Sequence, residues 1–410
     1  MKTLYMAMRL SASGDGKKST PAVKVAIAAV ALSVAVMLAA IAIVMGFKEE
    51  ITRKVIGFNP HIVIKASQHA NNDDVLVSLT PSTKAVLDSL PYMTEYSLSA
   101  SVPAIFKPKS EFKGVYLKAG NDERLKDFLR SQLVSGKIPD FDNDSSALVI
   151  SDKAARQLEL KVGDELPTYF ITDEVKVRPL KIRGIYNSHF DTYDDIYAFG
   201  PMSLIQEIGG LGKAEGTYIN MYVDDFSRVS EYARDIQQRL LNAYSGGIIY
   251  KVYDVETALT SGANFFSWLS LLDTNVVVVL VLMTAVALIT LISGMMIIIV
   301  DKKRFIAIMK VLGAPNKMLR KIFVILTLRV AVVGLLIGNI LMLALLFWQA
   351  SEHVIPLDPE SYYIDFVPVK ITWESIVILN VAILVISYIM LLLPSRFVSS
   401  ISPARSLQSE

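Results

Sequence analysis

The hydrophobic positions of this chain are gathered in four long runs, separated by segments that mix polar and apolar residues. A helix needs roughly 20 apolar residues to cross the hydrocarbon core of a bilayer, and each run reaches that length. The pattern therefore predicts four transmembrane helices, over residues 25–46, 274–300, 322–348 and 373–393.

The first run begins at Val25 and is interrupted only by Ser33. A cleaved signal peptide is the alternative interpretation, but the apolar core of a signal peptide is shorter, about 7–15 residues. No small-residue cleavage pattern precedes Gly46. We therefore expect a retained helix that follows an N-terminal segment over residues 1–24.

Residues 47–273 have the alternating character of a water-exposed domain that contains both strands and helices. Glu165–Ile171 and Val175–Tyr186 predict a β-hairpin about the turn Thr172–Glu174. Tyr218–Val223 alternates as a strand, and the residues that follow have the 3.6-residue period of an amphipathic helix. The expected fold class is a four-helix membrane protein with a large α+β extracytoplasmic domain.

Charge fixes the expected orientation of the helices. Residues 301–321 contain seven Lys or Arg and one acid, whereas residues 349–372 contain one Lys and four acids. Basic segments stay on the cytoplasmic side of a membrane. We therefore expect residues 1–24, 301–321 and the tail 394–410 to be cytoplasmic, and the 47–273 domain and the 349–372 loop to lie outside.

Candidate chemistry is sparse. The chain has no cysteine, which excludes disulfides, thiolate metal ligands and cysteine nucleophiles. Its four histidines show no helical pair spacing, so we expect no metal site. His189 lies near three aspartates, at positions 191, 194 and 195. A hydrolytic or cation site is one interpretation; a solvated acidic loop is favoured, because no acid–base–nucleophile spacing recurs on one element.

Within the apolar runs, Gly334 and Gly338 have a small-xxx-small spacing that lets helices pack closely. Apart from Arg329, the spans offer no ionisable path for ions or polar solutes. Aromatic residues beginning at Phe265 precede the second run. They fit an interfacial belt, and the alternative is the lining of a lateral opening for an acyl chain.

Several strings resemble a known family. Lys303–Pro315 is similar to the coupling helix of FtsX-like ABC transporter permeases of the MacB type. Met45–Ile51, Gly57–Ile64 and Ile355–Ile364 resemble segments of the lipoprotein-release branch, LolC and LolE. The tail, with Ser402–Arg405, resembles the C-terminal end of the family. The resemblance covers essentially the full length.

The resemblance implies a permease subunit of the bacterial inner membrane that has no ATPase of its own and binds no cofactor. Expected partners are ABC ATPase subunits that use ATP and Mg²⁺, a second copy or homologue of the permease, and membrane lipids. The expected cargo is a lipoprotein, passed to a periplasmic carrier. No nucleic-acid partner is expected.

Site residues follow from the same resemblance. The short basic helix is expected to dock on the ATPase through Arg304, Ile308, Lys310, Val311, Leu312, Gly313, Ala314 and Pro315. Acyl chains are expected between the first and second helices, along Val36, Ala40, Ile43, Val44, Phe265, Leu269 and Leu272.

Carrier binding is expected at the tip of the predicted hairpin, at Asp173 and Glu174. Some permeases of the Lol branch present a protruding hook there. Here the turn is only Thr172–Glu174, with Pro179 on the return strand, which leaves little to protrude. Either this chain is the hookless partner of a hetero-pair, which we favour, or its carrier docks elsewhere.

Three other functions compete with lipoprotein release. Mechanotransmission to a cell-wall hydrolase is the first, although permeases of that kind usually have a much smaller external domain. Efflux with an outer-membrane partner is the second, although MacB carries a fused ATPase that is absent here. The third is a membrane-anchored enzyme, for which the sequence offers no polar constellation.

Overall fold

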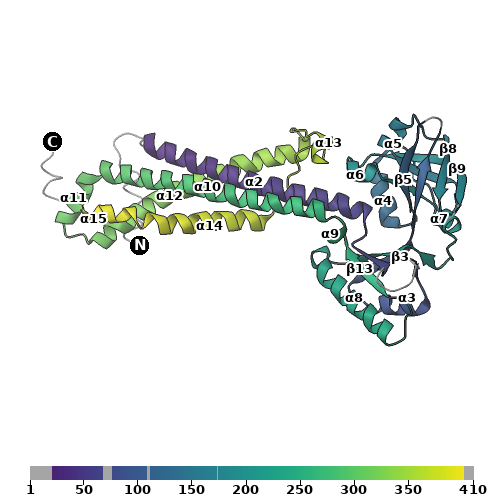
Figure 1. Ribbon diagram of the computed structural model, residues 1–410. Coiled ribbons are helices and arrows are strands. Elements are labelled where there is room, and N and C mark those ends of the chain that lie inside the picture. Colours follow the sequence, from purple (N-terminus) through teal and green to yellow (C-terminus); the bar gives the residue numbers. More distant parts are fainter. Residues whose placement is uncertain (1–20, 68–75, 109–110, 173, 401–410) are drawn as a thin grey trace. The chain divides into compact units, whose positions relative to one another are not determined.

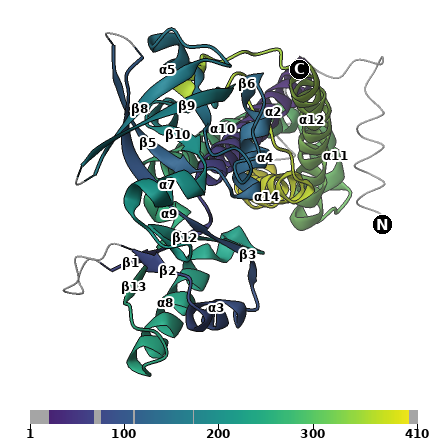
Figure 2. The same ribbon diagram turned by 90° about the vertical axis from the view of Figure 1, so that its right-hand side faces the viewer.

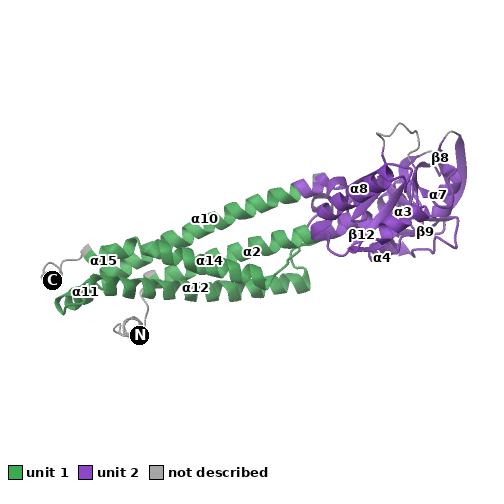
Figure 3. Cartoon of the chain, turned by 90° about the horizontal axis from the view of Figure 1, so that it is seen from below, with its two compact units in different colours: residues 1–49, 268–356, 366–410 green, residues 50–267, 357–365 purple. Residues whose placement is uncertain are grey.

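The computed structural model describes residues 21–67, 76–108, 111–172 and 174–400. The chain divides into two compact units (Figure 3). The helical unit takes in the described residues of 1–49, 268–356 and 366–410, and the α+β unit takes in residues 50–267 and 357–365. The middle of the predicted 349–372 loop therefore belongs with the α+β unit.

Four long helices dominate the helical unit (Figure 1), and each is long and apolar enough to cross a membrane. They are α2 (Pro21–Phe58), α10 (Ala263–Asp301), α12 (Asn316–Glu352) and α14 (Trp373–Leu391). Shorter elements are α11 (Lys303–Val311), η2 (Pro394–Arg396) and α15 (Phe397–Ser400).

Helix α2 continues well beyond residue 46, where its apolar run ends, and stops at Phe58. The next residues are Asn59 and Pro60, and a residue that precedes proline is disfavoured in the α conformation. The proline accounts for the end of α2. Residues 50–58 of this helix belong to the α+β unit, where Ile51, Val55 and Phe58 are buried.

Helix α12 packs directly against α2 through two glycines. A β-carbon at Gly338 would lie 2.5 Å from the carbonyl oxygen of Ala31, and one at Gly334 would lie 2.8 Å from the Cβ of Val30. Only glycine permits this approach, so the small-xxx-small spacing of the sequence does mark a helix contact.

An amide pair joins α12 to α14. Asn339 Nδ2 donates to Asn380 Oδ1 at 2.7 Å, and Asn380 Nδ2 donates back to Asn339 Oδ1 at 3.2 Å. Each amide also donates to a carbonyl of its own helix, four residues earlier. The two polar side chains therefore satisfy each other within apolar stretches of the two helices.

The larger sheet of the α+β unit has seven strands in the order β6-β9-β7-β10-β5-β4-β8. The last strand, β8, also pairs with the long strand β9, so six of the strands form a closed circuit and β6 stays at an edge. The strands are β4 (Ser101–Phe106), β5 (Lys113–Ala119), β6 (Leu133–Gly136), β7 (Ala147–Ser151), β8 (Glu165–Ile171), β9 (Val175–Tyr186) and β10 (Tyr197–Gly200). The predicted hairpin is confirmed.

Helices α5 (Asp152–Gln157) and α7 (Met202–Gly209) supply apolar residues to the core of this sheet. Ser151 is the N-cap of α5, its hydroxyl accepting from the amide of Ala154. Two other helices of the unit are α4 (Glu123–Ser131) and the single turn α6 (Asp191–Asp194). Figure 2 shows α5, α7 and the strands from a second direction.

The smaller sheet is fully antiparallel, in the order β13-β1-β12-β3. Helices α3 (Pro81–Asp88) and α8 (Val229–Ser245) share its core. Its strands are β1 (Ile62–Ala66), β3 (Met93–Ser99), β12 (Tyr218–Val223) and β13 (Tyr253–Thr257); β2 (Val77–Ser78) pairs with β11 (Glu215–Gly216). The short elements η1 (Phe226–Arg228), α9 (Ala258–Ser261) and α13 (Pro359–Tyr362) complete the unit.

Candidate functional site

The predicted coupling residues fall on α11 and on the turn that leads to α12. One side of α11 is fixed to the helical unit through buried Ile306 and Ala307. The opposite side exposes Ile308, Val311 and Leu312, whose exposed fractions are 45%, 65% and 76%. A spacing of three and four residues puts these three apolar side chains together on the helix surface.

The turn after α11 is built to stop the helix and start the next. Gly313 has a φ of +88°, which only glycine adopts without strain. Pro315 is the N-cap position of α12. Arg304 and Pro315 are exposed, and Ala314 is half-buried. Seven of the eight predicted coupling residues thus lie on or beside one exposed segment.

Lys310 has a different position from the others. Its Nζ donates to the carbonyl oxygen of Ser399 at 2.9 Å, and Arg320 Nε donates to the Ser399 hydroxyl at 2.8 Å. Burial lowers the pKa of Lys310. This lysine therefore helps to hold α15 beside α11, a contact that the resemblance alone did not suggest.

The predicted cargo-lining residues of α2 are all half-buried: Val36, Ala40, Ile43 and Val44. On α10, Leu272 is half-buried too, whereas Leu269 is 2% exposed. Lys48 of α2 and Asp273 of α10 form an ion pair at 2.8 Å, so a polar tie joins the two helices that we expect to flank the cargo.

Phe265 has an environment unlike that of the other predicted lining residues. Its ring lies 4.5 Å from that of Phe190 and 6.0 Å from that of Tyr363, and it also stacks with Tyr193. All four aromatic residues belong to the α+β unit. The structure therefore places Phe265 in an aromatic cluster rather than with Leu269 and Leu272.

The tip of the β8–β9 hairpin carries the predicted carrier-binding residues. Glu174 is exposed, and Asp173 lies outside the described residues. Beside the tip, Ile171 pairs with Val175 and Tyr169 pairs with Val177, which puts four apolar side chains on one outward face. We call these four residues the hairpin face.

The sequence did not predict the hairpin face. In this part of β9 the apolar side chains face outward and the basic side chains face α7, which reverses the usual arrangement of a half-buried strand. Lys176 and Arg178 lie on the side of the hairpin that faces α7, where Lys176 Nζ donates to the carbonyl oxygen of Ile208 and Arg178 forms an exposed pair with Glu207. Those contacts with α7 turn Val175 and Val177 to the outside, where both are exposed. The strict Val-Lys-Val-Arg alternation was the available signal.

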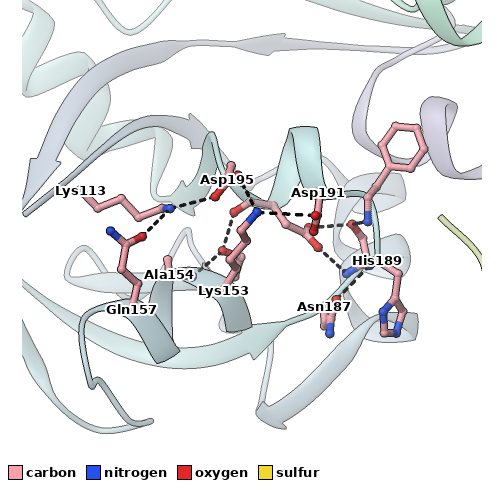
Figure 4. A network of polar contacts seen from close by, with 12 residues as sticks. Lys113, Lys153, Ala154, Gln157, Asn187, His189, Asp191 and Asp195 are labelled. Atoms are coloured by element: carbon pink, nitrogen blue, oxygen red, sulfur yellow. Dashed lines mark hydrogen bonds and ion pairs between the residues drawn. The ribbon is translucent and has the colours of Figure 1, made fainter. Parts of the chain in front are cut away.

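The interpretation of the acidic cluster near His189 as a solvated loop is wrong for Asp194, which is buried. Asp191 and Asp195 are half-exposed and belong to a network of polar contacts (Figure 4). Asp195 pairs with Lys113 at 3.0 Å and with Lys153 at 2.7 Å. Asp194 is 4% exposed and accepts from the amide and the hydroxyl of Ser188. Burial raises the pKa of Asp194 to about 6, against the opposing effect of these hydrogen bonds.

This network is structural in character. Lys153 also lies 3.6 Å from Asp191, and the hydrogen bond from Lys153 to Asp195 raises the pKa of that lysine. Within the described part of the chain, no group of three or more His, Cys, Asp or Glu side chains is placed to hold a metal ion. The charges neutralise one another across β5, α5 and α6.

Two family models match the chain. The MacB-like periplasmic core domain matches residues 25–239, about half of the chain, and the FtsX-like permease C-terminal model matches residues 276–403. Together they cover α12 and α14, most of α2 and α10, and most of the α+β unit.

Curated relatives match over nearly the whole length. The lipoprotein-releasing system transmembrane protein LolE of Haemophilus influenzae is 25% identical over 96% of this chain and 97% of its own. LolC of Xylella fastidiosa is 22% identical over 93% of this chain and 92% of its own. Among solved structures, the periplasmic region of MacB from Actinobacillus actinomycetemcomitans is 15% identical, covers 52% of this chain and 95% of that one, and has a TM-score of 0.34.

The fold class predicted from the sequence is confirmed: four long apolar helices accompany a MacB-like periplasmic α+β domain. Proteins of this kind are the transmembrane subunits of ABC transporters and are not themselves catalytic; their ATPase is a separate subunit. This chain belongs to the FtsX-like ABC transporter permeases that carry a MacB-like periplasmic core domain.

Proposed function

We propose that this permease extracts lipoproteins from the outer leaflet of the inner membrane and passes them to a periplasmic carrier. The observation that carries the proposal is the similarity to LolE and LolC, which spans both the helical and the α+β units. The N-terminal segment, α11 and the C-terminal tail are cytoplasmic in this proposal, because their segments of sequence are basic.

ATP hydrolysis reaches the permease through α11. Ile308, Val311 and Leu312 dock in a groove on the ATPase, with Arg304 and Pro315 at the edges. Their exposure supports this, since large apolar side chains on a short helix are otherwise costly to leave in water. Lys310 acts indirectly, by holding α15 in place. ATP and Mg²⁺ bind the partner and not this chain.

The acyl chains of the cargo lie between α2 and α10. The acyl chains leave one apolar environment, the bilayer, for another, so the transfer itself is nearly neutral. An apolar path spares them the cost of about 0.8 kcal/mol for each methylene exposed to water. Val36, Ala40, Ile43, Val44 and Leu272 are the residues that line this path. Opening it requires the Lys48–Asp273 pair to break.

The carrier docks at the β8–β9 hairpin, on Glu174 and on the hairpin face. Four outward apolar side chains beside an acidic tip give a surface that a protein partner can bury. The short turn still favours a second, hooked permease as the other half of the dimer.

Photo-crosslinkers in the membrane test the cargo. A benzophenone amino acid at Val44 or Leu272 is expected to capture lipoprotein in native membranes, whereas one at Leu336, an exposed position on α12, captures only phospholipid. Capture of phospholipid alone at all three positions would reject lipoprotein transport and favour mechanotransmission.

The same chemistry tests the carrier site in the α+β unit. Crosslinkers at Glu174 and Val177 are expected to capture the carrier, and one at Leu241, an exposed position on α8, serves as the control. Strong capture at Glu174 by a permease with no hooked partner would remove the reason for expecting a hetero-pair. Equal capture at Leu241 would argue against a specific site.

A further inference from the structure

Lys54 is a buried lysine that is held by carbonyl groups. It lies on α2 and is 6% exposed, and its Nζ donates to the carbonyl oxygens of Ser188 and Tyr363, both at 2.7 Å. Among the described residues, no carboxylate forms an ion pair with it within 4 Å. A buried ammonium group is costly unless its donors are satisfied. The two carbonyls accept two of its hydrogen bonds, and the carboxylates of Glu50, Asp365 and Asp194 add a Coulombic attraction from farther away.

The two carbonyls come from segments that lie far apart in sequence. Ser188 precedes His189, which has a φ of +55°, and Tyr363 has a φ of +62°. Residues other than glycine adopt this region rarely and at a cost. In both segments, an unfavourable backbone conformation accompanies the contact with Lys54. A second link, His189 Nε2 to Asp365 Oδ1 at 3.4 Å, joins the same segments.

Aromatic packing extends this junction to α10. Phe190, which lies two residues after Ser188, contacts both Phe265 of α10 and Tyr363, at ring distances of 4.5 Å and 4.9 Å. On the other side, Phe58 of α2 stacks on Tyr193 at 4.9 Å. The turn 187–193 thus touches α2, α10 and the 357–365 segment, all within the α+β unit.

We propose that Lys54 is a positioning residue that makes these segments move as one body. We call Lys54 Nζ and its two carbonyl partners the Lys54 pin. The pin ties the 187–193 turn and the 357–365 segment, which connects α12 to α14, to the outer part of α2. A shift of α2 during the transport cycle is therefore passed to both segments together. The role in a cycle rests on the proposed function; the tie itself does not.

Hydrogen exchange on the full chain in nanodiscs tests the tie. Lys54→Met keeps the length of the side chain and removes the donors, so we expect amides of 187–193 and 357–365 to exchange at least tenfold faster, with β7 and β10 unchanged. Lys126→Met is the matched control, because Lys126 is equally buried but pairs with Glu123 of its own helix; it should leave both segments protected.

Unchanged protection in Lys54→Met, or equal deprotection in Lys126→Met, would overturn the proposal. If Lys54→Met fails to fold, Lys54→Gln, which keeps a shorter donor, replaces it. The same faster exchange of 187–193 and 357–365 is expected, and unchanged exchange would overturn the proposal. Loss of protection in β7 and β10 as well as in the two segments would indicate general destabilisation and would also count against the pin.

Nucleotide trapping tests the role in the cycle. In the native assembly with its ATPase, a non-hydrolysable ATP analogue is expected to change the exchange of 187–193 and 357–365 by the same factor. In Lys54→Met the two factors are expected to differ by fivefold or more. Equal factors in the variant would contradict the proposal. If the wild-type segments ignore nucleotide while Lys54→Met still loosens them, the ATP-driven cycle is rejected and the tie stands.

Discussion

The coupling segment and the Lys54 pin present opposite chemistry. On α11 and its turn, Val311 and Leu312 are apolar and exposed, with nothing described that covers them. At the pin, a charged lysine is buried and its donors are satisfied by carbonyls of the chain itself. Exposed apolar groups are stabilised by a partner, whereas buried polar groups are stabilised by internal geometry.

The two regions are therefore sensitive to different kinds of substitution. The coupling segment depends on a partner protein, the ATPase. A single charge introduced on its exposed surface should therefore abolish coupling without destabilising the fold. The pin depends on backbone carbonyls from two distant segments, so changes there should alter motion inside the α+β unit.

The largest effect is expected from Leu312→Asp. A carboxylate at this exposed position must lose its water on docking, and hot-spot truncations cost 2 kcal/mol or more, so we expect at least a tenfold loss of ATP-driven release with an unchanged melting temperature. Leu312→Met keeps the apolar bulk and should retain most activity. If Leu312→Asp still binds its ATPase and exports normally, the coupling assignment is wrong.

Asp194→Asn is expected to change the pH dependence of stability beside the pin. The pKa of Asp194 is raised to about 6 in the folded chain, so the folded state binds its proton more tightly than the unfolded state does. The contribution of Asp194 to stability therefore falls as pH rises from about 4 to 6, by at most about 3 kcal/mol.

Asparagine does not titrate, so the melting temperature of Asp194→Asn minus that of the wild type should grow between pH 4.5 and pH 7. Thermal unfolding of both full chains in nanodiscs across this range provides the measurement. A difference that stays constant with pH would show that Asp194 has an ordinary pKa.

Gly338→Ala is expected to disturb α12, the helix that follows the coupling segment. The new methyl group would meet the Ala31 carbonyl oxygen at 2.5 Å, and overpacking of this kind costs about 1–3 kcal/mol. Gly294→Ala is the matched control, because its methyl group would lie at an ordinary 3.4 Å from Ala26. Equal melting temperatures for the two variants would mean that α2 and α12 do not pack this closely.

The smallest effect is expected from Asp273→Asn. The Lys48–Asp273 pair is half-exposed on both sides, and pairs of that kind contribute about 0–1 kcal/mol. We expect a barely changed melting temperature and a modestly faster uptake of cargo between α2 and α10. A fall in melting temperature as large as that of Gly338→Ala would make this pair a structural element rather than a weak tie.

The sequence predicted the features that depend on local pattern. Apolar runs identified the four long helices, and the β8–β9 hairpin was placed at its observed residues. Gly334 and Gly338 were identified as packing residues, although α2 as their neighbour was not. These features need only neighbours in sequence to be recognised.

Features that depend on distant segments were missed. Lys54 lies in a run of mixed polarity, and nothing there indicates carbonyls more than a hundred residues away. The interpretation of the aspartates as a solvated loop failed for Asp194, because the fold buries this side chain against Ser188. Tertiary contacts determine whether a charge is buried, and a periodicity cannot report them.

Reconstituted release is the measurement that tests the central claim most directly. The assembly containing this chain and its ATPase would be placed in proteoliposomes with a triacylated lipoprotein and the purified carrier. We expect lipoprotein to move to the soluble carrier only with hydrolysable ATP, and Leu312→Asp to abolish the transfer. If the assembly hydrolyses ATP and the carrier is functional, but all lipoprotein stays in the membrane, the proposed lipoprotein release is contradicted.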